Sequence, residues 1–235
     1  MTIRSLTCLA VAALCSPLAL AQADVEKLLL AALRTDSFNF LVTQEPAALA
    51  LAGSSVLRDQ DRLTLVLRSG LKKSFTNRPQ CHSEDVVELA QCVSYRLIAH
   101  MKSIHAFVVV KMLSDGGDYL VIDDQSGAET GLGNVPLFSR SGKRLIVAPT
   151  YVDEDGGTIQ IWSRVGDRYM RAWSGSPFLP DSAPAYVEYD PIQWDSEDKV
   201  QVRVNVRDFP KPERVVFFSL RRDSGNWRVV ETAAK

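Results

Sequence analysis

From Tyr95 onward the chain consists of short apolar stretches separated by turns, and this pattern restricts the possible folds more than any other feature. Glycine follows aspartate or serine in the turns, as in Asp115-Gly116-Gly117, Ser141-Gly142 and Ser224-Gly225. Such clusters mark tight reversals of the backbone. The stretches between them have the length and alternation of β-strands. The expected strands are 95–100, 105–112, 119–123, 144–149, 158–163, 169–173, 199–206, 214–220 and 226–231.

These strands repeat along the chain. An offset of about 39 residues matches Phe107-Val108, 119–122 and Gly127 with Ile146-Val147, 158–161 and Gly166. A second offset, of about 56 residues, matches Phe138, Lys143, Trp162 and Ser163 with Trp194, Lys199, Phe218 and Ser219. The extra length of the second offset falls in 181–191 and 208–212, which we expect to be loops. Units of about 40 residues with four short strands are typical of propeller blades.

The stretch Pro136-Leu137-Phe138-Ser139-Arg140-Ser141-Gly142-Lys143 resembles a turn found in the blades of many secreted β-propellers. That turn reads Phe-Ser-Pro-Asp-Gly-Lys, so Arg140 and Ser141 stand where Pro and Asp are usual. The resemblance covers 95–232 and implies blade architecture without assigning any catalytic residue. Three units can be traced and 63–76 offers a fourth. We therefore expect three to four propeller-like blades, closed or incomplete, or a twisted stack of antiparallel sheets.

Residues 1–21 have the layout of a secretory signal peptide. Arg4 supplies a positive charge, 6–20 is apolar, and Ala19-Leu20-Ala21 is a small-x-small cleavage site. An overlapping site extends cleavage to residue 23. The apolar run is short for a membrane span. The sequence therefore predicts a periplasmic or secreted protein that is not inserted in a membrane after signal cleavage.

Two regions are expected after the signal. Residues 24–60 form an N-terminal helical segment, with one helix starting at Asp24 and a second at 46–52 that stops before Gly53. Residues 61–235 form the propeller-like β domain. A short helical insert at 83–91 interrupts this domain.

Cys81 and Cys92 are the two cysteines that remain after the signal is removed. Two cysteines in an oxidising compartment form a disulfide most simply, and here it would close the loop 81–92 around the helical insert. A metal site needs further ligands at a matching distance, and only His82 lies near. A redox-active pair is normally spaced Cys-x-x-Cys. We expect a structural disulfide.

No catalytic set stands out. His100 and His105 flank a strand–turn–strand, and they can be metal ligands or a general base, or partly exposed residues at strand ends, which we favour. Asp123-Asp124 and 153–157 offer oxygen ligands for calcium, but hairpin turns explain such residues as well. Gly-x-Ser-x-Gly and His-Glu-x-x-His are missing. We expect no catalytic residue, no metal and no cofactor, and lean towards a protein that is not an enzyme.

The C-terminal half combines aromatic residues with arginines. Such residues dominate protein–protein interfaces, although a core of aromatics covered by arginine stems is the alternative. The proline-containing stretch 174–191 is the most promising loop for a partner contact. The expected partner-binding residues are Arg164, Arg168, Arg171, Trp173, Phe178, Tyr186 and Tyr189.

These observations favour a non-enzymatic periplasmic module that binds another protein. One version is an immunity-type inhibitor of a toxin delivered into the periplasm. A hydrolase acting on envelope material through a dispersed site, and a structural subunit of an envelope complex, are the alternatives. With a formal net charge of −1 and both signs interspersed, the chain lacks the field that nucleic acid or an anionic membrane attracts.

Overall fold

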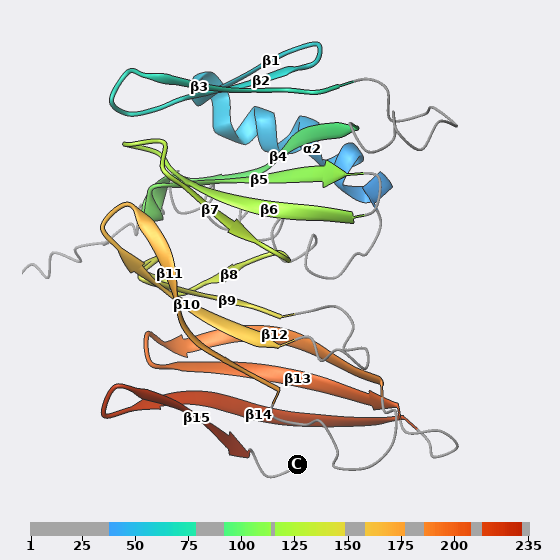
Figure 1. Ribbon diagram of the computed structural model, residues 1–235, viewed down its shortest axis with the longest axis vertical. Coiled ribbons are helices and arrows are strands. Elements are labelled where there is room, and N and C mark those ends of the chain that lie inside the picture. Colours follow the sequence, from blue (N-terminus) through green and yellow to red (C-terminus); the bar gives the residue numbers. More distant parts are fainter. Residues whose placement is uncertain are drawn as a thin grey trace, which may run out of the picture.

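Four antiparallel sheets follow one another along the chain and lie in a column along the long axis of the molecule (Figure 1). The computed structural model describes residues 38–78, 92–113, 116–148, 158–176, 186–207 and 213–231. The first sheet contains β1 (Val56–Asp59), β2 (Arg62–Val66) and β3 (Lys72–Thr76). The second contains β4 (Val93–Met101), β5 (Ala106–Leu113), β6 (Gly116–Asp123) and β7 (Glu129–Leu132). The third contains β8 (Leu137–Phe138), β9 (Arg144–Val147), β10 (Ile159–Val165) and β11 (Arg168–Gly175). The fourth contains β12 (Tyr186–Ser196), β13 (Lys199–Arg207), β14 (Arg214–Asp223) and β15 (Asn226–Glu231).

Each sheet is a meander in which strands pair in chain order. The expectation of a mainly β fold built from propeller-like antiparallel units is confirmed. The first and last sheets lie at opposite ends of the column, so the described sheets form an open stack (Figure 1). Matched residues of the sequence repeats fall on equivalent strands. Tyr119–Ile122 lies on β6 and Ile159–Ile161 on β10, each the third strand of its sheet.

Alternating side chains build a separate apolar core at each junction between sheets. In the second sheet, Phe107 and Val109 pack towards the first sheet, whereas Val108 and Val110 pack towards the third. The third core lies between the third and fourth sheets and includes Ile161, Val202 and Phe218. Successive residues of a strand point to opposite faces, so a strand in a sheet covered on both sides is apolar throughout.

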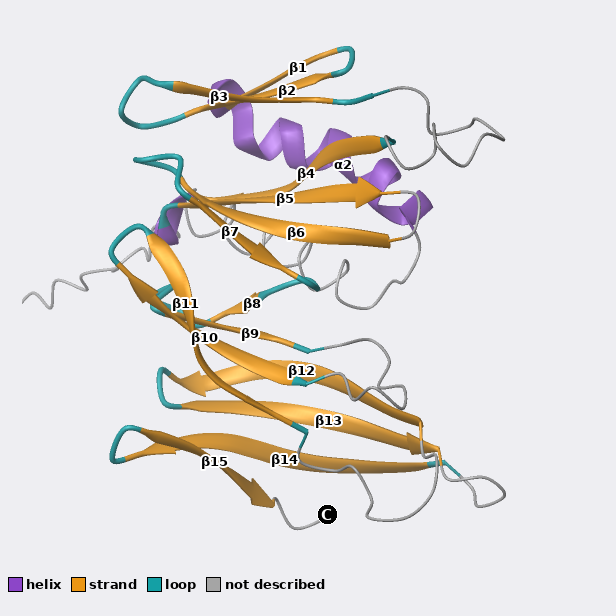
Figure 2. Ribbon diagram, in the orientation of Figure 1, coloured by secondary structure: helices purple, strands orange, loops and turns teal. Residues whose placement is uncertain are grey.

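Helix α2 (Phe38–Ala52) lies between the first sheet and β4 (Figure 2). Ala48 and Ala52 are buried against these strands, and their small side chains allow close approach. The buried Glu45 accepts a hydrogen bond from the backbone N–H of Leu97 at 3.0 Å, beside an irregularity in the β4–β5 ladder. The expected end at Ala52 is confirmed. The expected start at Pro46 is wrong, because the helix begins eight residues earlier at Phe38.

Four strands escaped the sequence prediction: β1, β7, β8 and β12. β1 lies inside the stretch 24–60 that was expected to be helical. The expected loop at 181–191 is wrong from Tyr186 onward, because β12 begins there and contains Pro191. β12 is an edge strand whose ladder with β13 shifts between Pro191 and Gln193. Prolines are tolerated on edge strands and at bulges.

Several expectations fall on residues outside the described ranges. These are the signal peptide at 1–21 with its cleavage limit at 23, the helix starting at Asp24, the helical insert at 83–91, Cys81, the acidic stretch 153–157 and the loop at 208–212. Cys92 is buried directly before β4, and its pairing with Cys81 stays a prediction. Among the described residues, no helix has the length and apolarity needed to cross a membrane.

Candidate functional site

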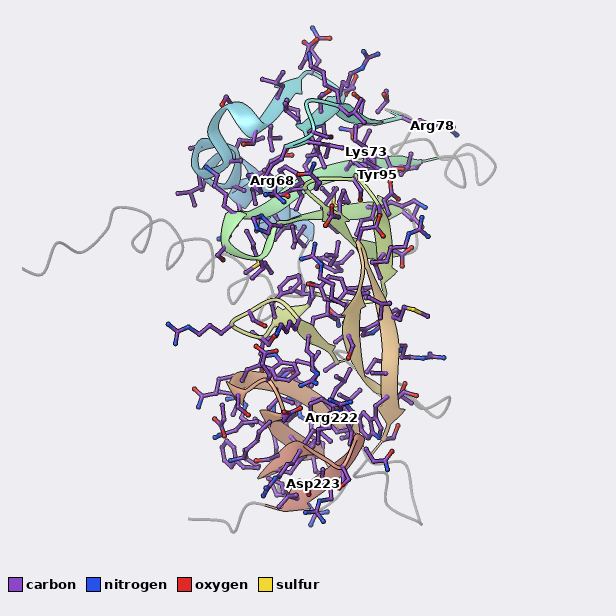
Figure 3. The ribbon with its side chains drawn as sticks, turned by 90° about the vertical axis from the view of Figure 1, so that its left-hand side faces the viewer. Arg68, Lys73, Arg78, Tyr95, Arg222 and Asp223 are labelled. Atoms are coloured by element: carbon purple, nitrogen blue, oxygen red, sulfur yellow. The ribbon has the colours of Figure 1, made fainter. Side chains whose placement is uncertain are left out.

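Hairpin turns from all four sheets lie along one edge of the stack, on the left in Figure 1; we call this side the turn edge. Figure 3 faces this edge, with Arg68 and Lys73 labelled in its upper part and Arg222 and Asp223 in its lower part. An arginine meets a carboxylate near the turns at every junction between sheets. The pairs are Arg68–Asp124, Arg164–Asp123 and Arg144–Asp198. These contacts tie each sheet to the next.

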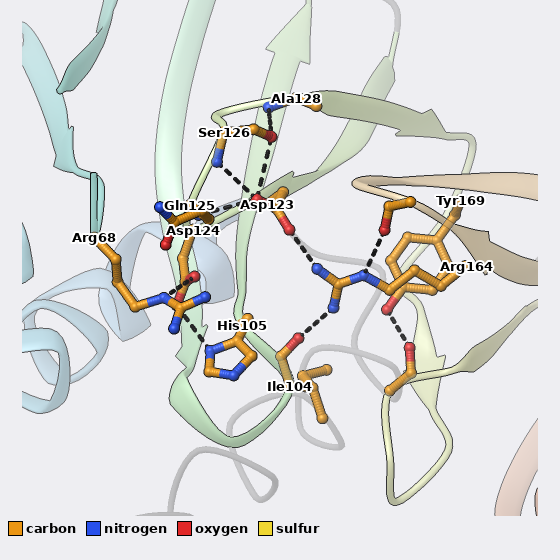
Figure 4. A network of polar contacts seen from close by, with 12 residues as sticks. Arg68, Ile104, His105, Asp123, Asp124, Gln125, Ser126, Ala128, Arg164 and Tyr169 are labelled. Atoms are coloured by element: carbon orange, nitrogen blue, oxygen red, sulfur yellow. Dashed lines mark hydrogen bonds and ion pairs between the residues drawn. The ribbon is translucent and has the colours of Figure 1, made fainter. Parts of the chain in front are cut away.

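Asp124 is the centre of the first tie (Figure 4). Its carboxylate is almost completely buried, and Oδ1 accepts a hydrogen bond from Arg68 Nε at 2.6 Å. Oδ2 lies 3.5 Å from His105 Nδ1 and 3.7 Å from His100 Nε2. The backbone N–H of Asp124 donates to the His105 carbonyl at 3.1 Å, and the N–H of Arg68 donates to the Asp124 carbonyl at 2.7 Å. Three turns from two sheets therefore meet at one residue.

His100 is buried and stacks on Phe107 with ring centroids 4.0 Å apart. Among the described residues, neither ring nitrogen finds a hydrogen-bond partner. Burial lowers the pKa of His100 from 6.5 to about 4, although the nearby Asp124 carboxylate acts in the opposite direction. The expectation of two partly exposed histidines is therefore wrong for His100. It is confirmed for His105, whose side chain is about half exposed.

The His105–Asp124 pair has the composition of a general base and its orienting carboxylate. Arg68 binds the same carboxylate, however, and the group is part of the tie between two sheets. Within the described part of the chain, no group of three His, Cys, Asp or Glu side chains is placed to hold a metal ion. We interpret this cluster as structural.

Asp123 makes the second tie. Its Oδ1 accepts hydrogen bonds from the backbone N–H groups of Gln125 and Ser126 at 2.9 and 2.8 Å. Its Oδ2 pairs with Arg164, whose Nη1 also donates to the Ile104 carbonyl at 2.6 Å. Burial by itself would raise the pKa of Asp123, but these hydrogen bonds and the Arg164 charge outweigh it and lower the pKa. Of the candidate calcium ligands, Asp123 and Asp124 are thus bound by arginine, and the stretch 153–157 lies outside the described ranges.

Arg164 also lies over the ring of Tyr169, with its guanidinium carbon 5.9 Å from the ring centroid. Burial raises the pKa of Tyr169 to about 12, despite the opposing effect of Arg164. The Tyr169 hydroxyl donates to the Gly142 carbonyl at 2.6 Å. This phenol therefore keeps its proton at neutral pH and fixes the β8–β9 turn.

Glu197 reinforces the third tie, the Arg144–Asp198 pair, from the same β12–β13 turn. It accepts hydrogen bonds from the Ser139 hydroxyl at 2.8 Å and from the Ser141 backbone N–H at 3.2 Å. Burial by itself would raise the pKa of Glu197, yet the serine hydrogen bonds and the Arg144 charge lower it. Next to it, Trp194 Nε1 donates to the Leu137 carbonyl at 2.9 Å. This acidic turn therefore joins two sheets.

The structure scatters the expected partner-binding residues over different environments. Arg164 is engaged at the turn edge and Tyr189 lies in the core between the third and fourth sheets. Trp173 packs against the same core, whereas Arg168 and Arg171 are exposed on the edge strand β11. The described ranges exclude Phe178 and the side chain of Tyr186. Partner binding through Arg168 and Arg171 stays a prediction.

A different surface carries the clearest exposed apolar group. It is the side of the last sheet that points away from the third sheet, and we call it the outer face. Val215, Phe217 and Val230 are exposed there by 51%, 45% and 38%. Val215 and Phe217 alternate along β14 with Val216 and Phe218, which pack on the opposite side into the core. No element within the described ranges packs on the outer face.

Sequence reasoning missed this surface, although a signal for it exists. Val215-Val216-Phe217-Phe218 is an unbroken apolar run, which is typical of a strand covered on both faces. The partner-binding prediction considered only arginines and the rings of tyrosine, tryptophan and loop phenylalanine. An apolar run predicts that both faces of a strand are covered. Where the strand belongs to a terminal sheet, one of these faces has no neighbouring sheet and its apolar side chains are exposed.

No protein-family model, curated protein or solved structure matches this chain.

Proposed function

We propose that this protein is an exported, non-enzymatic module that binds another protein on its outer face. The observation that carries the proposal is the exposure of Val215, Phe217 and Val230 on a terminal sheet. Burying a fully exposed large apolar side chain contributes about 2 kcal/mol, so covering these three half-exposed side chains contributes about 3 kcal/mol to a binding free energy. Exposed apolar clusters with polar surroundings are typical of interaction sites.

The contrast between β14 and β5 supports this function. The run Ala106–Val110 in β5 is buried at every position because sheets cover both of its sides. The run Val215–Phe218 in β14 has the same apolar composition, but only one side is covered. A partner on the outer face would give β14 the environment that its sequence fits.

The arrangement of titratable groups supports a role without catalysis. Asp123, Asp124 and Glu197 are bound by arginine or serine groups that join the sheets. A general base must be able to take a proton from substrate, and these carboxylates are engaged in holding turns. An immunity-type inhibitor of a periplasm-delivered toxin is one form that such a binding module can take.

Affinity capture from envelope extract, with the mature oxidised protein as bait, tests the proposal. The surface variant is Phe217→Asp, and the matched control is Leu57→Asp, which changes a 49% exposed apolar residue at the other end of the stack. We expect one stoichiometric protein to be retained by the wild type and by the control. Loss of a central interface side chain weakens binding by about thirtyfold or more, so Phe217→Asp should release it.

Both variants change exposed positions, so their midpoints of thermal unfolding should stay close to that of the wild type. Equal retention by all three proteins would contradict docking on the outer face. Failure of the wild type to retain any protein would contradict the binding function itself.

A further inference from the structure

A row of three cations crosses the outer face beside the apolar group. Lys199 on β13 lies directly opposite Arg221 on β14, and Arg221 lies directly opposite Arg228 on β15. Residues directly opposite on one face of an antiparallel pair have Cβ atoms about 5 Å apart, and like charges in this position are destabilising. We call these three residues the cation row. The fold therefore keeps an arrangement that costs stability.

Neighbouring carboxylates compensate the cation row only in part. Asp195 pairs with Lys199 at 2.8 Å, whereas Asp223 serves both Arg221, at 3.1 Å, and Arg228. The side chains of Arg221 and Arg228 are 57% and 63% exposed, and that of Asp223 is 32% exposed. Three positive groups thus face two less exposed negative groups. The excess of positive charge is local to the cation row, because elsewhere on the outer face Arg203 pairs with Asp190 and Arg207 pairs with Glu213, and Glu188 adds a further carboxylate.

The cation row and the apolar group occupy one continuous surface. Val230 lies opposite Ser219, one position of the outer face away from Arg221. Phe217 precedes Arg221 by four residues, which is roughly 13 Å along an extended strand. A partner segment of a few residues is long enough to contact both.

Charge also argues against a second copy of this chain as the occupant. Packing two outer faces together would bring two cation rows into one interface. Packing the outer face on the opposite end of the stack would bring it to Arg62 and Lys72, which point away from the buried Leu63 and Phe75 and are accompanied there by one strand carboxylate, Asp59, opposite Arg62. Either arrangement places like charges together, which costs binding free energy.

We infer that the outer face binds an acidic protein segment, with carboxylates on the cation row and an apolar side chain on Phe217. This inference rests on the proposed function and specifies its partner. The cation row spans three strands, or roughly 10 Å, and the chain as a whole has a formal net charge of −1. Nucleic-acid binding draws on many phosphate contacts, so a short row favours a protein carboxylate.

Titration of the isotope-labelled full protein with two synthetic peptides, followed by NMR, tests this assignment. One peptide alternates glutamate with leucine and phenylalanine, and the other has lysine in place of each glutamate. We expect the acidic peptide to shift the amide signals of β13, β14 and β15 at low salt, and the basic peptide to leave them unchanged. Added salt should weaken the acidic complex.

The double variant Arg221→Gln/Arg228→Gln should lower the affinity for the acidic peptide about tenfold or more, because glutamine keeps much of the side-chain length but removes the charge. Its matched control is Arg62→Gln/Lys72→Gln at the other end, which should bind like the wild type. Three results would overturn the inference: equal binding of the two peptides, an affinity of Arg221→Gln/Arg228→Gln for the acidic peptide equal to that of the wild type, or signal shifts confined to the other sheets. Tighter binding of a single-stranded oligonucleotide than of the acidic peptide would also overturn it.

The capture experiment separates this inference from the proposed function. A captured protein that depends on Phe217 but is retained by Arg221→Gln/Arg228→Gln leaves the binding function in place and removes the acidic partner. Release of the captured protein by Phe217→Asp and by Arg221→Gln/Arg228→Gln supports both the binding function and the acidic partner. The double variant should unfold close to the wild-type temperature, because relief of the repulsion between cations offsets the loss of two exposed ion pairs with Asp223.

Discussion

At the scale of single residues, the structure separates side chains that hold the sheets together from those that face solvent. Arg164 and Arg171 looked alike in the sequence, yet Arg164 joins the second and third sheets and Arg171 is exposed. Sequence alternation places both arginines on strands. It does not indicate that Arg164 contacts Asp123, which lies 41 residues earlier in the chain and in the neighbouring sheet. That information comes only from the stacking of sheets.

Arg164→Ala should lower the free energy of unfolding by about 2 kcal/mol, because it leaves Asp123 without its partner in a largely buried place. Arg171→Ala should change this free energy by less than about 0.5 kcal/mol. Denaturation in urea measures both. Equal effects of the two substitutions would contradict the structural role of Arg164.

His100 should make stability depend on pH in the mildly acidic range. Its pKa is about 4 in the folded protein, below the value of 6.5 for an unperturbed group. The unfolded chain therefore binds the extra proton first, and the free energy of unfolding falls as pH falls from about 6.5 to about 4. Below that range this group adds no further loss. A shift of this size corresponds to on the order of 3 kcal/mol.

His100→Phe removes the titrating ring but keeps a flat side chain on Phe107. Urea denaturation at several pH values between about 7 and about 4 should show a shallower loss of stability for this variant than for the wild type. His105→Gln, which alters the exposed histidine, should keep most of the slope. An unchanged slope in His100→Phe would show that other groups control acid sensitivity.

At the scale of elements, the sequence predicted strands wherever alternation and a glycine turn occur together. All nine expected strands are present within a few residues of their predicted bounds. The missed strands lack one of these signals. β8 has only two residues, and β12 contains Pro191, which a sequence pattern treats as a loop signal. β12 forms because it lies at a sheet edge, and edge position is a property of the assembled sheet.

Turns at the turn edge differ in how closely the next sheet approaches them. Gly142 has a φ of +67°, and a Cβ added there would lie 2.4 Å from the Ile104 Cβ of the neighbouring sheet. Gly166 has a similar φ of +63° but no atom within 4 Å of its added Cβ. Gly166→Ala should therefore cost about 1 kcal/mol for the left-handed backbone alone.

Gly142→Ala should cost about 2 kcal/mol more than Gly166→Ala, because it also forces the second and third sheets apart. Thermal unfolding followed by circular dichroism compares the two variants directly. Similar costs would mean that the β8–β9 turn adjusts without moving the second sheet.

At the scale of the whole molecule, the open stack has two covered sheets and two terminal sheets. The second and third sheets contribute residues to two cores each, and the first and last sheets contribute to one. Stacked units of this kind depend on their nearest neighbours for stability. The sequence repeat indicated such units, but whether the units close into a ring depends on sheet twist, which no residue pattern encodes directly.

Hydrogen exchange should follow this layering. Amides of β5 should exchange most slowly, because both faces of their sheet are covered, and amides of β15 and β1 should exchange faster. Exchange followed by mass spectrometry or NMR measures the order. Protection of β15 equal to that of β5 would indicate that the whole stack opens as a single unit.

The meander connectivity has a consequence for the time at which binding becomes possible. Each sheet pairs strands that follow one another in the chain, and each layer packs on the one before it. Ribosomes make the N-terminal layers first, and domains fold as their segments emerge. Arg228 and Val230 lie on β15, the last strand within the described ranges, so a chain interrupted before β15 lacks part of the outer face. The partner that we propose would therefore bind only chains whose synthesis has passed β15.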